Sequence, residues 1–294
     1  MSEEHAIRPM RLEDVEPTAD VMINGGWGDR RRFLRFCVER SRLVPLVAEV
    51  DDRIVGTGVA TINGPVGWVG MIFVDEGLRG RGIGTSLTRA VIDELERAGC
   101  ASQVLLASPF GRPIYERLGF DAELEYRLIA APGLGEKPPA GADAGPTGES
   151  GVSPTPRLRA FAPKDLPAIL AIDAAATGED RAHLLGASAD PATGVVALDP
   201  DGRVVGFELR APWGTHPIVA PELVDGVRLL EDRRTRTAAG AEVRTALPDA
   251  NRTGLTTLEN LGWRPERELV RMVRGAPVRW QPTAIWGQFN FAVG

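Results

Sequence analysis

Apolar and polar residues recur with two different periods along the first 130 residues, and this alternation predicts the order of the elements. Strand-like runs cover residues 6–10, 44–50, 53–62, 66–74, 103–107 and 120–129. Helical spacing begins near residues 12, 31, 84 and 108. The third helix carries Leu87, Val91 and Leu95 on one face, which is expected to pack against a sheet. The order of elements predicts an α/β (α+β) fold.

Residues 131–156 break this pattern. The segment contains six prolines and six glycines, no aromatic residue and no periodic apolar positions. A chain of this composition cannot bury enough apolar surface to fold by itself. We therefore expect a linker over residues 131–156, between a first domain at residues 1–130 and a second domain at residues 157–294.

The second half repeats features of the first half. Residues 204–206 (Val-Val-Gly) follow an acidic turn, as residues 54–56 (Ile-Val-Gly) do. Residues 258–263 match residues 115–120 in their spacing of apolar residues around a glycine. Repetition of several features in the same order indicates a duplicated domain.

Composition narrows the class of protein. The formal net charge is −6 and no basic stripe is found, so nucleic acid is not an expected partner. The two cysteines, Cys37 and Cys100, are too few for a disulfide framework or a zinc site and are expected to be core residues. The sequence shows neither a signal peptide nor an apolar run long enough to span a bilayer. We expect a cytoplasmic protein without a metal or a membrane partner.

A glycine-rich turn that bears two arginines follows the predicted strand ending at Val74. Residues 79–85 read Arg-Gly-Arg-Gly-Ile-Gly-Thr, and the amphipathic helix begins within them. Glycines allow successive N–H groups to point at one position, and a helix start carries partial positive charge. A phosphate-bearing ligand is therefore expected here. The spacing matches neither the dinucleotide fingerprint nor the Walker loop, which disfavours a nucleotide-binding enzyme.

The spacing Arg79-x-x-Gly82-x-Gly84 resembles the pyrophosphate loop of the GNAT superfamily of N-acetyltransferases. A second resemblance lies at Tyr115, which is followed by Glu-Arg-Leu-Gly-Phe. GNAT domains commonly carry a tyrosine, two residues, a small apolar residue and Gly-Phe at this point. The two motifs occur in the order that the family shows.

The resemblance implies two GNAT-like domains, each with a mixed, mostly antiparallel central sheet flanked by helices. Residues 1–130 would be the catalytic domain and would bind acetyl-CoA as cosubstrate. Residues 157–294 contain no such loop and carry Leu258 at the tyrosine position. A phosphate at the corresponding turn would meet Glu222 and Asp225, so this half resembles the degenerate C-terminal domain of tandem GNAT proteins.

The resemblance places the cofactor site in the first domain. Phe73 and Val74 are expected to contact the pantetheine arm through main-chain groups. The pyrophosphate is assigned to Arg79, Gly80, Arg81, Gly82, Ile83, Gly84 and Thr85. Ser108 stands where many relatives have a polar residue that contacts the cofactor arm, although its hydroxyl could equally cap the next helix.

Tyr115 is the candidate general acid. A phenol is protonated at neutral pH and can give its proton to a departing thiolate. The alternative is that Tyr115 is an amphipathic core residue with a satisfied hydroxyl. Trp27 and Met71 are expected to line the acceptor pocket. No general base is evident, because Glu49, the nearest candidate, precedes a hairpin turn where carboxylates are usually solvated.

The sequence favours an N-acetyltransferase that moves an acetyl group from acetyl-CoA directly to the primary amine of a small molecule or amino-acid-like acceptor. The alternative is a non-catalytic acyl-CoA-binding sensor or regulatory protein that uses the same loop. The second domain could serve as a substrate lid or as a dimerisation surface, so a homodimer is possible.

Overall fold

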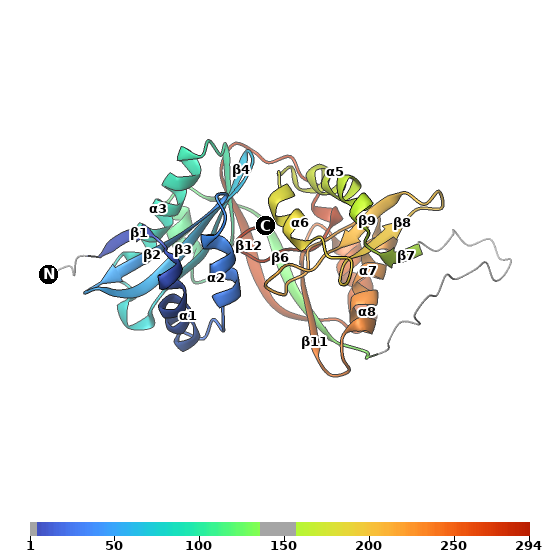
Figure 1. Ribbon diagram of the computed structural model, residues 1–294, viewed down its shortest axis with the longest axis horizontal. Helices are drawn as coiled ribbons and strands as arrows, with labels where there is room; N and C mark the ends of the chain where they lie inside the picture. Colours follow the sequence, from blue (N-terminus) through green and yellow to red (C-terminus); the bar gives the residue numbers. More distant parts are fainter. Residues whose placement is uncertain (1–4, 136–156) are drawn as a thin grey trace.

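The computed structural model describes residues 5–135 and 157–294, which form two sheets flanked by helices (Figure 1). This arrangement of mostly antiparallel strands confirms the predicted fold class. The first half contains β1 (Ala6–Pro9), α1 (Val15–Asn24), α2 (Arg31–Val38), β2 (Leu43–Val50), β3 (Arg53–Asn63), β4 (Val66–Val74), α3 (Ile83–Arg97), β5 (Ser102–Ala107), α4 (Arg112–Arg117) and β6 (Asp121–Pro132). The second half contains β7 (Arg157–Ala160), α5 (Leu166–Thr177), α6 (Ala182–Ser188), β8 (Val195–Leu198), β9 (Val204–Glu208), β10 (Ile218–Val219), α7 (Leu223–Arg236), β11 (Glu242–Pro248), α8 (Arg252–Asn260), β12 (Arg264–Gly275) and β13 (Ile285–Gly287).

The two halves exchange their last long strands. The larger sheet has eight strands in the order β1-β2-β3-β4-β5-β12-β6-β11. Strand β12 of the second half therefore lies between β5 and β6 of the first half, and β6 pairs on its other edge with β11 of the second half. Both long strands cross the middle of the molecule in Figure 1. The sequence did not predict this exchange, because the pattern of a strand does not show which half supplies its partner.

The alternating pattern of β12 shows why this strand fits its position. Met272 is fully buried against Leu105 and Ala107, on the face that α3 covers. Arg271 is directed to the opposite face, where it is 2% exposed. Since successive side chains of a strand point to opposite faces, the register Met272↔Leu105 fixes which residues of β12 enter the core of the first half.

The predicted duplication is visible in a repeated local contact. Arg8 of β1 binds Asp14 at 2.6 and 2.9 Å, and Arg159 of β7 binds Asp165 at 2.6 and 2.8 Å, each pair six residues apart. In both halves the same carboxylate also accepts a backbone N–H three residues before it. These matching contacts tie the first strand to the first helix in each half, which supports an origin of both halves from one repeating unit.

The predicted inward face of α3 is confirmed. Leu87, Val91 and Leu95 of α3 are fully buried. Cys37 and Cys100 are buried free thiols, as expected of core residues. One hydrophobic cluster joins α2 of the first half to the second half, and it includes Phe33, Phe36, Phe207, Phe289 and Val293. The halves thus share a core as well as a sheet.

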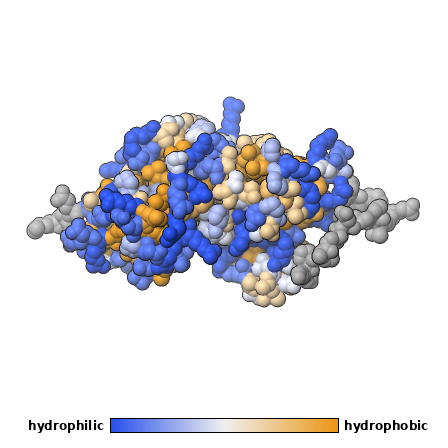
Figure 2. All heavy atoms as spheres, in the orientation of Figure 1, coloured by the Kyte–Doolittle hydropathy of each residue, from blue (hydrophilic) through white to orange (hydrophobic). Residues whose placement is uncertain are grey.

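Residues 136–156 of the expected linker lie outside the described residues. Strand β6 continues through Pro132, and the N–H groups of Gly133 and Leu134 donate to the carbonyls of Ala241 and Arg234 at 2.7 and 2.9 Å. The start of the expected linker is thus bound to the second half. Among the helices of the described ranges, none combines the length and the apolar character that crossing a membrane requires. Hydrophilic residues dominate much of the face shown in Figure 2, with apolar areas between them.

The strand exchange predicts that the two halves stay together after the chain is cut. A protease site inserted after Gly148 should give two fragments that elute together on size exclusion and melt in one transition, because β5 and β11 each pair with a strand of the other half. The uncut protein is the control. Two fragments that separate and each fold as a monomer would contradict the prediction.

Candidate active site

Strands β4 and β5 part from each other in the middle of the larger sheet. They pair in parallel only over residues 66–68 and 102–104, and the last pair is Trp68↔Val104. Beyond that pair β4 runs on to Val74 while β5 runs on to Ala107. The facing edge of β4 is therefore open, and its backbone groups can pair with an extended ligand.

A bulge in β4 lies at the start of this open edge. Met71 has a φ of +54°, which is rare for a residue with a side chain. The register of β4 against β3 shifts there, between the pairs Val59↔Gly70 and Thr57↔Phe73. Backbone strain of this kind costs on the order of 1–3 kcal/mol and is concentrated at functional sites. Met71, an expected acceptor-site residue, is thus held in a strained position beside the open edge.

Phe73 and Val74 are both expected to contact the pantetheine arm, but their backbone groups point to opposite edges of β4. The N–H of Asp75 donates to the carbonyl of Val55 on β3 at 2.8 Å, so the backbone groups of Phe73 also face β3 by strand alternation. Those of Val74 face the open edge, where its carbonyl accepts a bond of 3.2 Å from Nε of Arg79. The Phe73 side chain is buried. The geometry favours Val74 over Phe73 as a ligand contact, and both assignments remain predictions.

The glycine-rich loop leads from β4 into α3. Gly80 and Gly82 have φ values of +80° and +86°, and an added Cβ at either residue would meet no atom within 4 Å. These glycines are therefore required for their backbone angles rather than for space. Gly82 is the N-cap of α3, and the first turn, Ile83 to Thr85, presents N–H groups with no partner in the helix. An anion is favoured at this position.

Cationic and aromatic side chains surround the mouth of the loop. Arg79 is partly exposed, and its guanidinium lies 3.8 Å from the Glu76 carboxylate. The Arg79 guanidinium also lies 6.0 Å from the ring centre of Phe110, which is 76% exposed. Arg81 is exposed on the same loop. Sequence reasoning missed Phe110, whose only signal was an aromatic residue in a polar loop.

Tyr115 lies on α4 and packs into the core on the α3 side of the sheet. Its ring meets that of Phe120 edge to face, with centres 6.1 Å apart. Burial raises the pKa of Tyr115 to about 12. Its hydroxyl has no hydrogen-bond partner among the side chains that the structure describes. The residue is therefore protonated at physiological pH. Its role as general acid and the alternative of a satisfied core tyrosine both remain predictions.

Ser108 is exposed just after β5. Its Oγ accepts the N–H of Gly111 at 3.2 Å, and its carbonyl accepts the N–H groups of Gly111 and Arg112, both at 3.0 Å. The serine thus stabilises the turn that precedes α4, whose N-cap is Gly111. This contact resembles the alternative role of Ser108, which is to cap the next helix. A contact between Ser108 and the cofactor arm remains a prediction.

Trp27 and the other expected acceptor residues lie on the side of the sheet opposite α3. Trp27 is 38% exposed in the loop between α1 and α2. Its ring meets that of Phe73 edge to face, with centres 5.3 Å apart. Met71 packs against the same hydrophobic cluster as Phe73. The structure therefore brings Trp27 and Met71 to one region, at the end of β4.

The corresponding position in the second half is filled by the chain itself. Strand β13 pairs antiparallel with β10, and the Thr245 hydroxyl on β11 donates to the carbonyl of Trp286 on β13. The Trp286 ring presses on α7, where a Cβ on Gly226 would lie 2.0 Å from it. The elements β10, α7 and β11 follow one another along the chain as β4, α3 and β5 do in the first half. Strand β13 therefore occupies the slot that is open in the first half. The helix start there carries Glu222 and Asp225, as the sequence indicated.

Past β13 the chain continues onto the first half. Gly70 on β4 is packed so closely that an added Cβ would lie 2.2 Å from the Cα of Ala292. The carbonyl of Ala292 accepts the Thr61 hydroxyl at 3.1 Å, and that of Val293 accepts the Asn63 amide at 3.0 Å. Residues 292 and 293 are thus packed against the first half.

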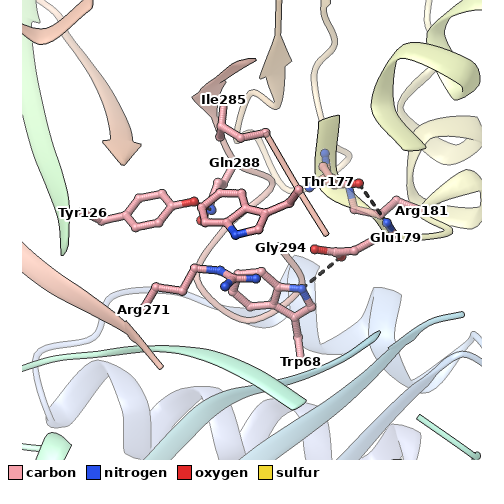
Figure 3. Close-up of a pocket in the computed structure, with 10 residues that line it drawn as sticks. Trp68, Tyr126, Thr177, Glu179, Arg181, Arg271, Ile285, Gln288 and Gly294 are labelled. Carbon is pink, nitrogen blue, oxygen red and sulfur yellow. Dashed lines mark hydrogen bonds between the residues drawn. The ribbon is translucent and has the colours of Figure 1, made fainter. Parts of the chain in front are cut away.

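A small cavity of about 10 Å³, lined by polar and aromatic side chains, lies between the two halves next to Trp68 (Figure 3). The Trp68 Nε1–H donates to Oε2 of Glu179 at 3.0 Å, and the Asn63 amide donates to the same oxygen at 2.7 Å. Burial raises the pKa of Glu179 to about 7. Sequence reasoning missed this carboxylate, because nothing in its neighbours along the chain shows that it enters the other half.

The two histidines of the second half, His183 and His216, each lie within hydrogen-bond distance of a polar partner. Nε2 of His183 lies 3.0 Å from the Asn63 oxygen, and Nδ1 of His216 lies 2.8 Å from the Glu208 carboxylate. Burial lowers the pKa of His183 to about 4 and also lowers the pKa of His216. Both side chains are therefore neutral at physiological pH.

Comparison with known proteins agrees with this geometry. The model of a family described as "Acetyltransferase (GNAT) family" matches residues 12–120, and one described as "Acetyltransferase (GNAT) domain" matches residues 169–287. A chain from Pyrococcus horikoshii that is assigned as an acetyltransferase has a TM-score of 0.76 at 21% identity, over 99% of this chain and 96% of that one. A GCN5-related N-acetyltransferase from Sphaerobacter thermophilus has a TM-score of 0.61 at 18% identity, over 95% and 98%. These two structures show the fold.

A curated relative covers a shorter stretch. The protein named "Probable glucosamine 6-phosphate N-acetyltransferase 2", from Oryza sativa subsp. japonica, is 34% identical over an alignment of 88 residues that covers 26% of this chain. The chain spans about half of that relative, 53% of its length.

The position of Glu179 predicts how stability depends on pH. Since its folded-state pKa of about 7 exceeds the ordinary 4.5, the folded protein binds the proton more tightly, and the free energy of unfolding falls as pH rises from 4.5 through 7. The fall is about 3 kcal/mol at most. The variant Glu179→Gln lacks this titration, so urea denaturation at about pH 5 and about pH 8 should show a smaller fall for the variant. Equal falls would mean that Glu179 titrates normally.

Proposed function

Because the chain belongs to the GNAT acetyltransferase family, we propose that it is an acetyl-CoA-dependent N-acetyltransferase. It moves the acetyl group directly to the primary amine of a small molecule or amino-acid-like acceptor. The observation that supports this most is the contrast between the halves: β4 has an open edge that leads into an anion-binding loop, whereas β13 fills the matching slot of the second half. The reaction is accordingly assigned to residues 1–130.

The cofactor is proposed to lie along the open edge of β4. Its pantetheine arm forms hydrogen bonds with backbone groups at Val74. Its pyrophosphate accepts hydrogen bonds from the N–H groups of the first turn of α3. Arg79 and Arg81 add positive charge beside these groups. The bond from Arg79 to the Val74 carbonyl, at 3.2 Å, would have to yield to a pantetheine that pairs with that carbonyl.

Transfer requires the amine nitrogen to attack the thioester carbon while the carbon–sulfur bond breaks. The departing thiolate takes a proton from the Tyr115 hydroxyl, and the proton that the nitrogen loses on forming the amide restores the phenol through solvent. A pKa of about 12 keeps Tyr115 protonated throughout the physiological range. Its hydroxyl can supply the proton without breaking another hydrogen bond in the described residues.

The acceptor is proposed to approach beside Trp27 and Met71. An exposed indole ring next to a strained backbone suits an amine with an apolar or planar body. The curated rice relative carries the name of an amino-sugar phosphate acetyltransferase, which supports a small-molecule acceptor. Since this chain covers about half of that relative, the sugar itself is not carried over.

Reversing the charge of Arg79 tests the cofactor site. The variant Arg79→Glu should weaken acetyl-CoA binding about tenfold or more, because it removes a charged hydrogen bond to phosphate and adds repulsion. Arg89→Glu is the matched control, since Arg89 is exposed on α3, the helix that follows the loop. Calorimetry should show a much smaller effect for the control. Unchanged affinity in Arg79→Glu would remove the loop assignment.

Removing one hydroxyl tests the chemistry. The variant Tyr115→Phe should lower turnover about 10²-fold or more, as loss of a general acid does, while acetyl-CoA affinity changes little. Thermal stability should stay the same, since the hydroxyl has no partner in the described part of the protein. Thiol release with a panel of amines is the measurement. Normal turnover would assign the proton to another group, and absence of thiol release in the unmodified protein would favour the acyl-CoA sensor.

A further inference from the structure

The first half offers few groups that could take a proton from the acceptor. Glu49, the candidate considered from the sequence, binds Nη2 of Arg8 at 2.5 Å beside the first strand of the sheet. That ion pair holds the carboxylate near β1, three strands away from the gap between β4 and β5. Glu49 is therefore poorly placed to act on an amine in that gap.

The second half inserts a different carboxylate into the first half. Glu179 lies between α5 and α6 and is 6% exposed. Its Oε2 accepts bonds from Trp68 and Asn63, both of the first half, and no donor among the described residues reaches its Oε1. Trp68 belongs to the last pair before β4 and β5 separate, so this carboxylate lies at the closed end of the proposed cofactor slot.

The cavity beside Glu179 is lined by polar as well as aromatic side chains and has room for one water molecule. Its volume is about 10 Å³, which is the space that a single water needs. The Gln288 amide donates to the Tyr126 hydroxyl at 2.9 Å, while its Oε1 is buried without a hydrogen bond in the described part of the chain. Figure 3 shows both side chains across the cavity from Glu179. A water here can donate to Gln288 and to Glu179.

The charged neighbours leave Glu179 free to exchange a proton. Arg181, the cation that most favours the ionised form of Glu179, binds Asp173 through hydrogen bonds of 2.5 and 3.0 Å, and both residues are buried. Burial is the main cause that raises the pKa of Glu179 to about 7, so protonated and ionised forms coexist near neutral pH. The titratable or charged groups that face it from the surrounding elements are Asp173, Arg181, His183, Tyr126, Arg271 and the main-chain carboxylate of Gly294.

We propose that Glu179, supplied by the second half, accepts the proton that the acceptor ammonium loses, through a water held in this cavity. This inference rests on the proposed function. The ammonium gives a proton to the water, and the water passes one of its own to the Glu179 carboxylate. The neutral amine then attacks the thioester, Tyr115 protonates the thiolate, and Glu179 later releases its proton to solvent. The second half thus completes the chemistry of the first.

Two probe amines of different basicity test this role in the full-length protein. Benzylamine is protonated at neutral pH and needs a proton acceptor, whereas phenylhydrazine is largely neutral and does not. With benzylamine, Glu179→Gln should lower kcat about 10²-fold and should abolish the fall in kcat that the unmodified enzyme shows below about pH 7. With phenylhydrazine the same variant should stay within about threefold of the unmodified enzyme.

The control variant is Asp180→Asn, which changes the next carboxylate, exposed and bound to Arg42 at 2.7 Å. It should leave both probes unaffected. Equal losses with both amines in Glu179→Gln, or an unchanged pH profile, would overturn the proton-acceptor role while leaving the acetyltransferase function intact. If the unmodified enzyme releases no thiol with either probe or with any amine of the panel, the proposed function fails, and this inference fails with it.

Discussion

Backbone pairing between the halves constrains the whole molecule. Strand β12 lies between β5 and β6, and β6 in turn pairs with β11, so each half depends on the other for hydrogen bonds along a long strand. An unpaired buried backbone group costs free energy comparable to a lost hydrogen bond, and a ladder of such groups is costly to separate. The two halves therefore cannot move far apart as independent domains joined by a linker would. Their relative position is fixed, and residues of one half can take precise places in the other.

The fixed position of the two halves determines which of their residues reach the candidate site. In the second half, β13 and Trp286 occupy the slot beside β10, which leaves no room for a cofactor arm. The same segment then continues to Gly70 and closes the sheet face opposite α3. Duplication has thus produced one half that is open to a ligand and one whose matching slot is packed with its own chain. The second half covers this face of the candidate site, and it brings the Glu179 carboxylate within hydrogen-bond distance of Trp68.

Buried polar groups at the boundary are satisfied by partners from both halves. Asn63 illustrates this, because its amide binds Glu179 and Val293 while its oxygen lies 3.0 Å from His183. Each of these partners comes from the second half. Buried polar groups are costly when unpaired, so such a network favours one arrangement of the halves over others. Precise placement of Glu179 follows from this network, and that placement gives the carboxylate its raised pKa.

Local sequence features determined the elements and the glycine-rich loop between β4 and α3. The two φ-positive glycines, the helix that follows them and the inward leucines of α3 all depend on neighbours within a few residues, so their patterns could be read directly. Tyr115 was predicted as the general acid in the same way, and that role remains a prediction. The strand exchange, the filling of the second slot by β13 and the entry of Glu179 into the first half were decided only by the tertiary structure. A strand pattern records which face is buried but not which strand lies beside it, and a carboxylate acquires its pKa from groups that are distant in sequence.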